Sequence, residues 1–199
     1  MRTEFDAVVV GAGPAGSTAA ILLSRAGWSV ALVEKERFPR RKVCGECIAA
    51  SNLPLLEALV IGPAFDAAAG PDLRRVALLR GGRSIEADLP AADHEKYPWG
   101  RALGRETLDT LLLEQARATG AEVLQPWSVQ ALEGAPGDWR CGIRSVESGS
   151  TATLRCRVAI DAHGSWEALP SARSHRHRAD GAADLLAFKA NFRGASLDE

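Results

Sequence analysis

The sequence predicts an α/β fold in which a Rossmann-like domain with a β-meander is joined to part of a second, mixed-sheet domain. Three observations lead to this prediction. Residues 5–34 contain an apolar β-branched run, three glycines at G-x-G-x-x-G spacing, a helical stretch, a second apolar run and an acid, in that order. Residues 122–161 contain short strand-like runs separated by Gly, Pro and Ser. Between them, Gly81 and Gly82 join two more such runs, a hairpin signal foreign to a minimal Rossmann unit.

The first segment has the residue types that a dinucleotide requires. Val8 to Val10 are predicted to form a buried parallel strand, and Gly11 allows a sharp turn into the following helix. Gly13 has no Cβ, so a pyrophosphate can approach the backbone, and Gly16 lets the helix and strand lie close together. The helix N-terminus offers unpaired N–H groups to the phosphates. Gly27 is expected to end this helix.

Glu34 follows the second apolar run. A carboxylate at this position accepts hydrogen bonds from the ribose hydroxyls and repels a 2′-phosphate. The sequence therefore predicts a site for FAD or NAD(H) rather than NADP(H).

The next part of the chain is predicted to contain a loop, a short helix and a hairpin. Residues 35–46 are polar and form the loop, and residues 54–60 have a helical pattern. Residues 72–79 and 83–89 are expected to be the paired strands of the hairpin. We expect this hairpin to begin a second domain that covers the substrate.

The chain then returns to a helix and to short strands. Residues 105–119 have the period of an amphipathic helix, and Gly120 ends it. The strands expected after it are residues 122–124, 128–133, 139–146, 152–156 and 157–161.

A last strand is predicted at residues 185–193, shortly before the sequence stops. Such a strand leaves an open edge and an uncovered apolar face, so we expect this chain to be a fragment of a longer enzyme. The predicted first domain comprises residues 1–70 and 98–165. The partial substrate domain comprises residues 71–97 and 166–199.

Composition excludes several functional classes. A net charge of −1 argues against a nucleic-acid partner, and the basic clusters at residues 37–42 and 173–178 are expected to be solvated loops. No apolar run is long enough for an integral membrane segment, and a first strand starting by Phe5 leaves no room for a signal peptide. We therefore expect a cytoplasmic protein whose four cysteines are reduced thiols.

Four motifs together resemble one enzyme family. They are GAGPAG with Glu34, FPRRKVCGE at residues 38–46, the R-x-x-L-D start at Arg105, and AIDAHGSW at residues 159–166. This combination is similar to the FAD-dependent oxidoreductases of the para-hydroxybenzoate hydroxylase and geranylgeranyl reductase superfamily. The family's later G-D motif is absent from the sequence, as is most of the substrate domain.

The resemblance implies FAD as the cofactor and assigns residues to it. The glycine motif and Glu34 would hold the ADP half, and Arg105 with Arg41 or Lys42 would touch ribose or phosphate. Val129 would meet adenine through its backbone, and Cys44 and Gly45 would lie beside the isoalloxazine ring. Asp109 is expected to pair locally instead. The full expected cofactor-binding set is Gly11, Gly13, Pro14, Ala15, Gly16, Glu34, Lys35, Arg41, Cys44, Gly45, Arg105, Val129, Asp161 and Gly164.

The expected activity is that of an FAD-dependent monooxygenase of the hydroxylase type, acting on an apolar or aromatic small molecule. NAD(P)H would be the reductant; however, His163 replaces the family's usual aspartate, which favours a reductase partner as electron donor. No catalytic residue is assigned. Flavin-dependent halogenases are close in pattern, but their W-x-W-x-I-P segment is absent.

Three alternatives remain open at this point. One is a geranylgeranyl reductase-like enzyme that reduces C=C bonds. Another is a disulfide oxidoreductase that uses Cys44 and Cys47, a C-x-x-C pair. The third is a non-catalytic, truncated nucleotide-binding module. Zinc is not expected, because Cys141 and Cys156 provide no second C-x-x-C pair.

Overall fold

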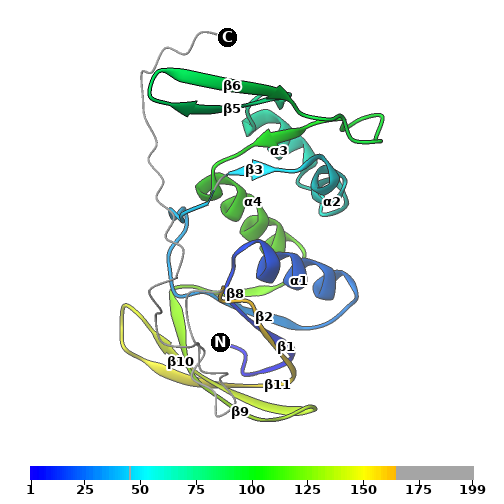
Figure 1. Ribbon diagram of the computed structural model, residues 1–199. Helices are drawn as coiled ribbons and strands as arrows, with labels where there is room; N and C mark the ends of the chain where they lie inside the picture. Colours follow the sequence, from blue (N-terminus) through cyan, green and yellow to red (C-terminus); the bar gives the residue numbers. More distant parts are fainter. Residues whose placement is uncertain (45, 165–199) are drawn as a thin grey trace.

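The computed structural model describes residues 1–44 and 46–164. Within these residues the main element is a six-stranded sheet with the order β8-β2-β1-β11-β10-β9 (Figure 1). The strands β8, β2, β1 and β11 are parallel, and β9 and β10 continue from β11 as an antiparallel meander. The strand bounds are β1 Glu4–Val10, β2 Val30–Val33, β8 Glu122–Leu124, β9 Trp127–Ala135, β10 Asp138–Ser145 and β11 Thr151–Asp161. The predicted α/β fold with a β-meander is confirmed.

The two long helices, α1 (Pro14–Arg25) and α4 (Arg105–Ala118), lie together on one side of this sheet (Figure 1). Neighbouring residues of β1 point to opposite faces: Val9 belongs to the core under the helices, whereas Val8 and Val10 belong to the core on the meander side. Each buried parallel strand thus contributes to two cores.

One strand prediction was wrong. Residues 152–156 and 157–161 were expected to be two strands, but β11 runs without a break from Thr151 to Asp161. The first half pairs antiparallel with β10, and the second half pairs parallel with β1 in the register Val10↔Asp161. The continuity comes from these two partners, which lie far from β11 in the sequence. The strand predicted at residues 185–193 lies outside the described residues.

A smaller region lies beyond the helices. It contains a three-stranded sheet, order β3-β7-β4, and the separate hairpin β5–β6 (Figure 1). The predicted short helix is present as α2, and a second short helix, α3, has no counterpart among the elements predicted from the sequence. It has a proline in its first turn, where proline is favoured. The bounds are β3 Cys47–Ile48, a 3₁₀ turn Ala50–Asn52, α2 Leu53–Ala58, α3 Gly62–Ala68, β4 Asp72–Leu73, β5 Arg75–Arg80, β6 Arg83–Asp88 and β7 Gly100–Ala102.

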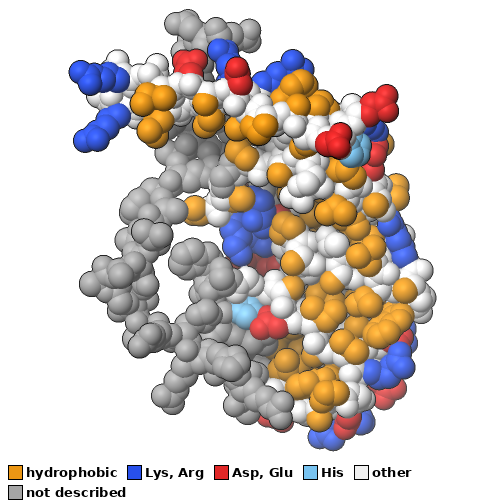
Figure 2. All heavy atoms as spheres, turned by 45° about the vertical axis from the view of Figure 1, so that its right-hand side comes forward, with side chains coloured by type: hydrophobic (Ala, Val, Ile, Leu, Met, Phe, Trp, Pro, Cys, Tyr) orange, Lys and Arg blue, Asp and Glu red, His pale blue; other side chains and the backbone are white. Residues whose placement is uncertain are grey.

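The predicted hairpin is confirmed, but its first strand is shorter than predicted: Asp72–Leu73 forms β4, which pairs with β7, and Arg75–Arg80 pairs with β6. Gly81 and Gly82 both have positive φ, 55° and 75°, as a tight two-residue hairpin turn requires. All residues of β5 and β6 are exposed, and hydrophobic side chains are visible on the surface at the top of Figure 2. No helix among the described residues is long and apolar enough to cross a membrane.

Val60, just after α2, has a left-handed backbone with φ 65° and an exposed side chain. A β-branched residue is strained in this conformation, which glycine adopts freely. We expect Val60→Gly to raise the free energy of unfolding by about 1 kcal/mol. Chemical denaturation measures this change. Val146→Gly is the control, because Val146 is similarly exposed but is not left-handed, and a loss of stability in Val60→Gly would contradict the prediction.

Candidate functional site

The glycine motif forms the turn between β1 and α1, and its three glycines have different roles. Gly11 has φ +96°, and a Cβ there would lie 2.6 Å from the Ala162 carbonyl oxygen. A Cβ on Gly16 would lie 1.8 Å from the Gly11 carbonyl oxygen. Packing of the protein itself therefore requires Gly11 and Gly16.

Gly13 is different, because no contact with the described residues requires a glycine there. Its backbone is extended, with φ −69° and ψ −177°. A Cβ on it would come no closer than 3.7 Å to another group, Nη2 of Arg105. The missing side chain thus leaves open space in front of the N-terminus of α1, which is where a phosphate would bind.

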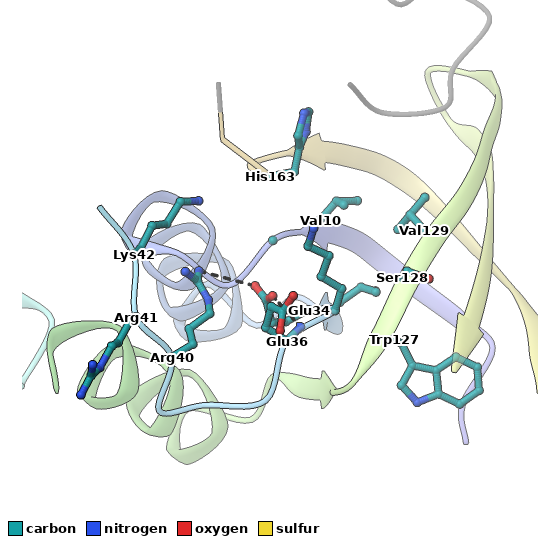
Figure 3. A pocket seen from close by; sticks show the side chains of 13 residues that line it. Val10, Glu34, Glu36, Arg40, Arg41, Lys42, Trp127, Ser128, Val129 and His163 are labelled. Atoms are coloured by element: carbon teal, nitrogen blue, oxygen red, sulfur yellow. Dashed lines mark hydrogen bonds and ion pairs between the residues drawn. The ribbon is translucent and has the colours of Figure 1, made fainter. Parts of the chain in front are cut away.

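A cavity of about 570 Å³ opens beside this turn, at the carboxyl ends of β1 and β2 (Figure 3). The loop that follows β2 and the start of β9 form its walls. Ligands of open α/β sheets bind at this end of the strands. The lining residues are Val10, Gly11, Val33, Glu34, Lys35, Glu36, Arg40, Arg41, Lys42, Trp127, Ser128, Val129 and His163.

Glu34 lines the cavity and is 5% exposed. Its Oε2 accepts a hydrogen bond of 2.8 Å from the Ala12 N–H, and its Oε1 accepts one of 2.9 Å from the Glu36 N–H. The carboxylate therefore ties the glycine turn to the loop after β2. The sequence predicted its place at the end of β2 but not these backbone partners.

Arg40, which was absent from the predicted set, points into the site. Its side chain is 14% exposed, and its guanidinium lies 4.7 Å from the centre of the Phe38 ring. Its Nη2 lies 3.5 Å from Oδ2 of Asp109 and 3.9 Å from Oε2 of Glu34 (Figure 3). The predicted neighbour, Arg41, lies on the rim with an 86% exposed side chain, 3.5 Å from Glu106. Nothing in the sequence of an irregular loop indicates which of two adjacent arginines faces inward.

Arg105 is the first residue of α4, and its side chain reaches the same part of the site as that of Arg40. Its Nε and Nη2 donate hydrogen bonds of 2.7 and 2.9 Å to the two carboxylate oxygens of Asp109. Burial opposes its charge, but the hydrogen bonds and the negative charge of Asp109, with a further hydrogen bond to Cys44, raise the pKa of Arg105 above its usual value. Arg105 therefore remains a cation beside Gly13. Asp109 pairs locally, as the sequence analysis expected.

The predicted motif AIDAHGSW begins at the end of β11. Asp161 ends the strand, and its Oδ1 contacts Nδ1 of His163 and accepts a bond of 3.3 Å from the His163 N–H. A Cβ on Gly164 would lie 3.3 Å from Nζ of Lys42, so this motif adjoins the loop after β2. His163 itself lines the cavity.

The predicted site residues thus lie in different parts of the site. Gly11, Glu34, Lys35, Arg41 and Val129 line the cavity. Pro14 and Ala15 form the first turn of α1 with Gly16, and Cys44 lies beside Arg105. Gly45 lies outside the described residues.

Two further cysteines, Cys141 and Cys156, are part of the protein interior. Cys141 and Cys156 are buried free thiols on neighbouring strands. Burial raises the pKa of Cys141 to about 12 and raises that of Cys156. Both are therefore neutral packing residues. The described residues contain no cluster of three or more His, Cys, Asp or Glu side chains that could hold a metal.

Residues 4–193 match the family described as FAD binding domain. The chain belongs to this family. FAD is accordingly the cofactor of this FAD-binding chain, and the residues of the site suit it. The buried Nε of Arg40 has no hydrogen-bond partner among the described residues, a deficit that an anionic ligand would meet. Open space at Gly13 lies next to two guanidinium groups.

Known proteins similar to this FAD-binding chain include a halogenase and a reductase. Tryptophan 2-halogenase from Chondromyces crocatus is 33% identical over 159 residues, which cover 79% of this chain and 30% of that protein. Menaquinone reductase from Mycobacterium tuberculosis is 36% identical over 121 residues, 60% of this chain and 28% of that protein. The chain thus spans about 30% of the length of these relatives.

The fold has been solved in other flavoproteins. The myxobacterial chondrochloren halogenase CndH superimposes with a TM-score of 0.72 over 83% of this chain and 38% of that one, at 23% identity. At this identity the match establishes the fold. The relatives that are at least 30% identical to this chain include a halogenase, a menaquinone reductase and a digeranylgeranylglycerophospholipid reductase.

Proposed function

We propose that this chain is the cofactor-binding part of an FAD-dependent oxidoreductase. The enzyme would be a monooxygenase of the hydroxylase type that acts on an apolar or aromatic small molecule. The observation that carries the proposal is the cavity at the ends of β1 and β2, with two arginines held beside an open Gly13. When bound, the flavin supplies the redox chemistry, and the residues of this chain bind and orient it.

Each group of the site has a proposed task toward FAD. Gly13 and the N-terminus of α1 would admit the diphosphate, and Arg40 and Arg105 would donate hydrogen bonds to it. Glu34 would accept hydrogen bonds from the ribose, and the backbone of Val129 would meet adenine. Cys44 and Gly45 would lie toward the isoalloxazine ring, and Asp161 and Gly164 would also contact the cofactor.

We also propose the domain division predicted from the sequence, with residues 1–70 and 98–165 in the FAD domain. Residues 71–97 and 166–199 would belong to the substrate domain. The apolar face of the hairpin supports this division: Val76, Leu78 and Ile85 are 52%, 70% and 71% exposed. Contiguous apolar surface of this kind marks a face that meets another layer or a ligand.

A reductase of C=C bonds is the second candidate. Similarity to menaquinone reductase and, at 32% identity, to digeranylgeranylglycerophospholipid reductase from Methanosphaerula palustris favours it. The two candidates differ in their use of oxygen. Oxygen consumption coupled to product formation by the full-length protein supports the monooxygenase, and oxygen-independent turnover supports the reductase.

The first experiment is therefore an absorbance spectrum of the purified full-length protein, followed by anaerobic titration with NADH and with NADPH. Flavin bands in the blue and near ultraviolet are expected, and their bleaching identifies the reductant. If neither nucleotide bleaches the flavin, a reductase partner supplies the electrons. A colourless protein that does not take up added FAD would overturn the proposal.

Substitution of Cys44 and Cys47 distinguishes our proposal from a mechanism in which these two cysteines form a redox-active dithiol. Cys47 lies in β3, paired with Ala102, whereas Cys44 lies beside Arg105. We expect Cys47→Ser to leave flavin reduction intact and Cys44→Ser to change flavin affinity or the substrate reaction modestly. Stopped-flow reduction measures both. Loss of activity in either variant, together with a thiolate-to-flavin charge-transfer band in the wild type, would replace our proposal with a disulfide oxidoreductase.

A further inference from the structure

Asp109 is a fully buried carboxylate on an otherwise apolar face of α4. Its buried neighbours on the helix include Leu108, Leu112 and Ala116. Burying a charge is costly unless it is paired, and even a paired buried charge is often no more stabilising than an apolar residue of similar size. The position of Asp109 therefore calls for a reason other than stability.

Two arginines from separate segments meet at this carboxylate. Arg105, one turn earlier on α4, is bidentate to it. Arg40 comes from the loop after β2, and its Nη2 lies 3.5 Å from Oδ2. Apart from the Phe38 ring, the buried Nε of Arg40 has no acceptor in the described chain. Asp109 thus neutralises one of the two positive charges that converge on it.

The two guanidinium groups converge on one point. Nη2 of Arg105 and Nη2 of Arg40 lie 3.7 and 3.9 Å from the position that a Cβ on Gly13 would take. Two cations at such a distance from one point repel each other, and the carboxylate between them offsets this repulsion. Without it, Arg105 loses its bidentate acceptor, and Arg40 loses the nearer of its two carboxylates but keeps the Phe38 ring and Glu34, whose Oε2 is 3.9 Å from its Nη2.

We propose that Asp109 is a positioning residue for the cofactor: it holds Arg40 and Arg105 together beside Gly13, ready to bind a diphosphate. The inference rests on the proposed assignment of the cavity to the ADP half of FAD. A ligand that meets donors already in place does not have to order two long side chains, which improves its affinity. Asp109 therefore affects only the binding of the phosphates, and it does so by positioning the two arginines.

The test compares ADP with adenosine, which lacks the phosphates, by calorimetric titration of the protein after removal of bound flavin. For Asp109→Asn we expect ADP affinity to fall about tenfold to a hundredfold, since charge-assisted hydrogen bonds are lost, while adenosine affinity changes less than about threefold. Glu114→Gln is the matched control, because Glu114 forms an exposed ion pair on the same helix, 2.6 Å from Arg117. This control should leave both affinities unchanged.

A triple variant, compared with its double-variant background, tests whether Asp109 acts through the arginines. In the Arg40→Gln, Arg105→Gln background, adding Asp109→Asn should leave the preference for ADP over adenosine unaltered, because nothing remains to be positioned. A purely structural Asp109 would lower both affinities equally in either background, which would overturn the inference. Asp109→Ser provides a second neutral variant. If both neutral variants fail to fold, Asp109 is a stability residue and the inference is wrong.

The ligand affinities of the wild-type protein distinguish a failure of this inference from a failure of the proposed function. A wild-type protein that binds neither ADP nor adenosine contradicts the assignment of the cavity. A wild-type protein that prefers ADP, with the same preference retained in Asp109→Asn, contradicts only the role of Asp109.

Discussion

Replacing Gly13 by valine is expected to abolish FAD binding while leaving the protein folded. The backbone at Gly13 is extended, so any residue can adopt it, and a Cβ there meets the ends of the Arg105 and Arg40 side chains, at 3.7 and 3.9 Å. The isopropyl group would instead fill the space in front of α1 that the diphosphate needs. Flavin absorbance per protein and the melting temperature measure the two effects separately.

Gly16→Ala is the control for this experiment. For this variant we expect a large loss of stability, the reverse of the result for Gly13→Val. Its Cβ would lie 1.8 Å from the Gly11 carbonyl oxygen, so α1 cannot remain seated against β1. Overpacking in a tight core costs about 1–3 kcal/mol or more, and a backbone clash of this size lies at the upper end. Full retention of FAD by Gly13→Val would remove the basis for assigning the glycine turn to the cofactor.

Replacing Glu34 should have the second-largest effect. In Glu34→Gln we expect FAD affinity to fall by one to two orders of magnitude, since a charge-assisted hydrogen bond contributes about 1.5–3 kcal/mol. Glu34→Arg should eliminate binding, because it places a cation and a longer side chain in the cavity. Fluorescence titration with FAD measures these affinities.

Stability should change as well, because the carboxylate of Glu34 accepts the N–H groups of Ala12 and Glu36. An amide can accept through only one of its two groups, so one of these donors loses its partner in Glu34→Gln. A lower melting temperature without FAD is therefore expected. Glu36→Gln is the control, since the Glu36 side chain is exposed at the cavity, and it should preserve affinity and melting temperature. Unchanged FAD affinity in both Glu34 variants would disprove the role of this carboxylate.

The sequence by itself determined the features whose cause is local. Glycines are needed where φ is positive, at Gly11 and in the hairpin turn at Gly81 and Gly82, and these requirements depend on the backbone of a few residues. The helix over residues 105–119 and the acid after the second strand follow from periodicity and spacing in the same way. The α/β fold and a site for FAD or NAD(H) could be predicted because this local order is itself the dinucleotide signature, whereas the choice of FAD came from the resemblance to a flavoenzyme family.

The tertiary structure alone decided which residues meet across the chain. β11 is one strand because β1 and β10 pair with its two halves, although both partners are distant in sequence. Arg40 rather than Arg41 turns inward because Phe38 and the buried Asp109 receive its guanidinium there. Asp109 is buried because α4 lies against the same turn that carries Gly13. Hydrogen bonds, ion pairs and burial depend on a partner's position in space, and local sequence preferences do not contain that information.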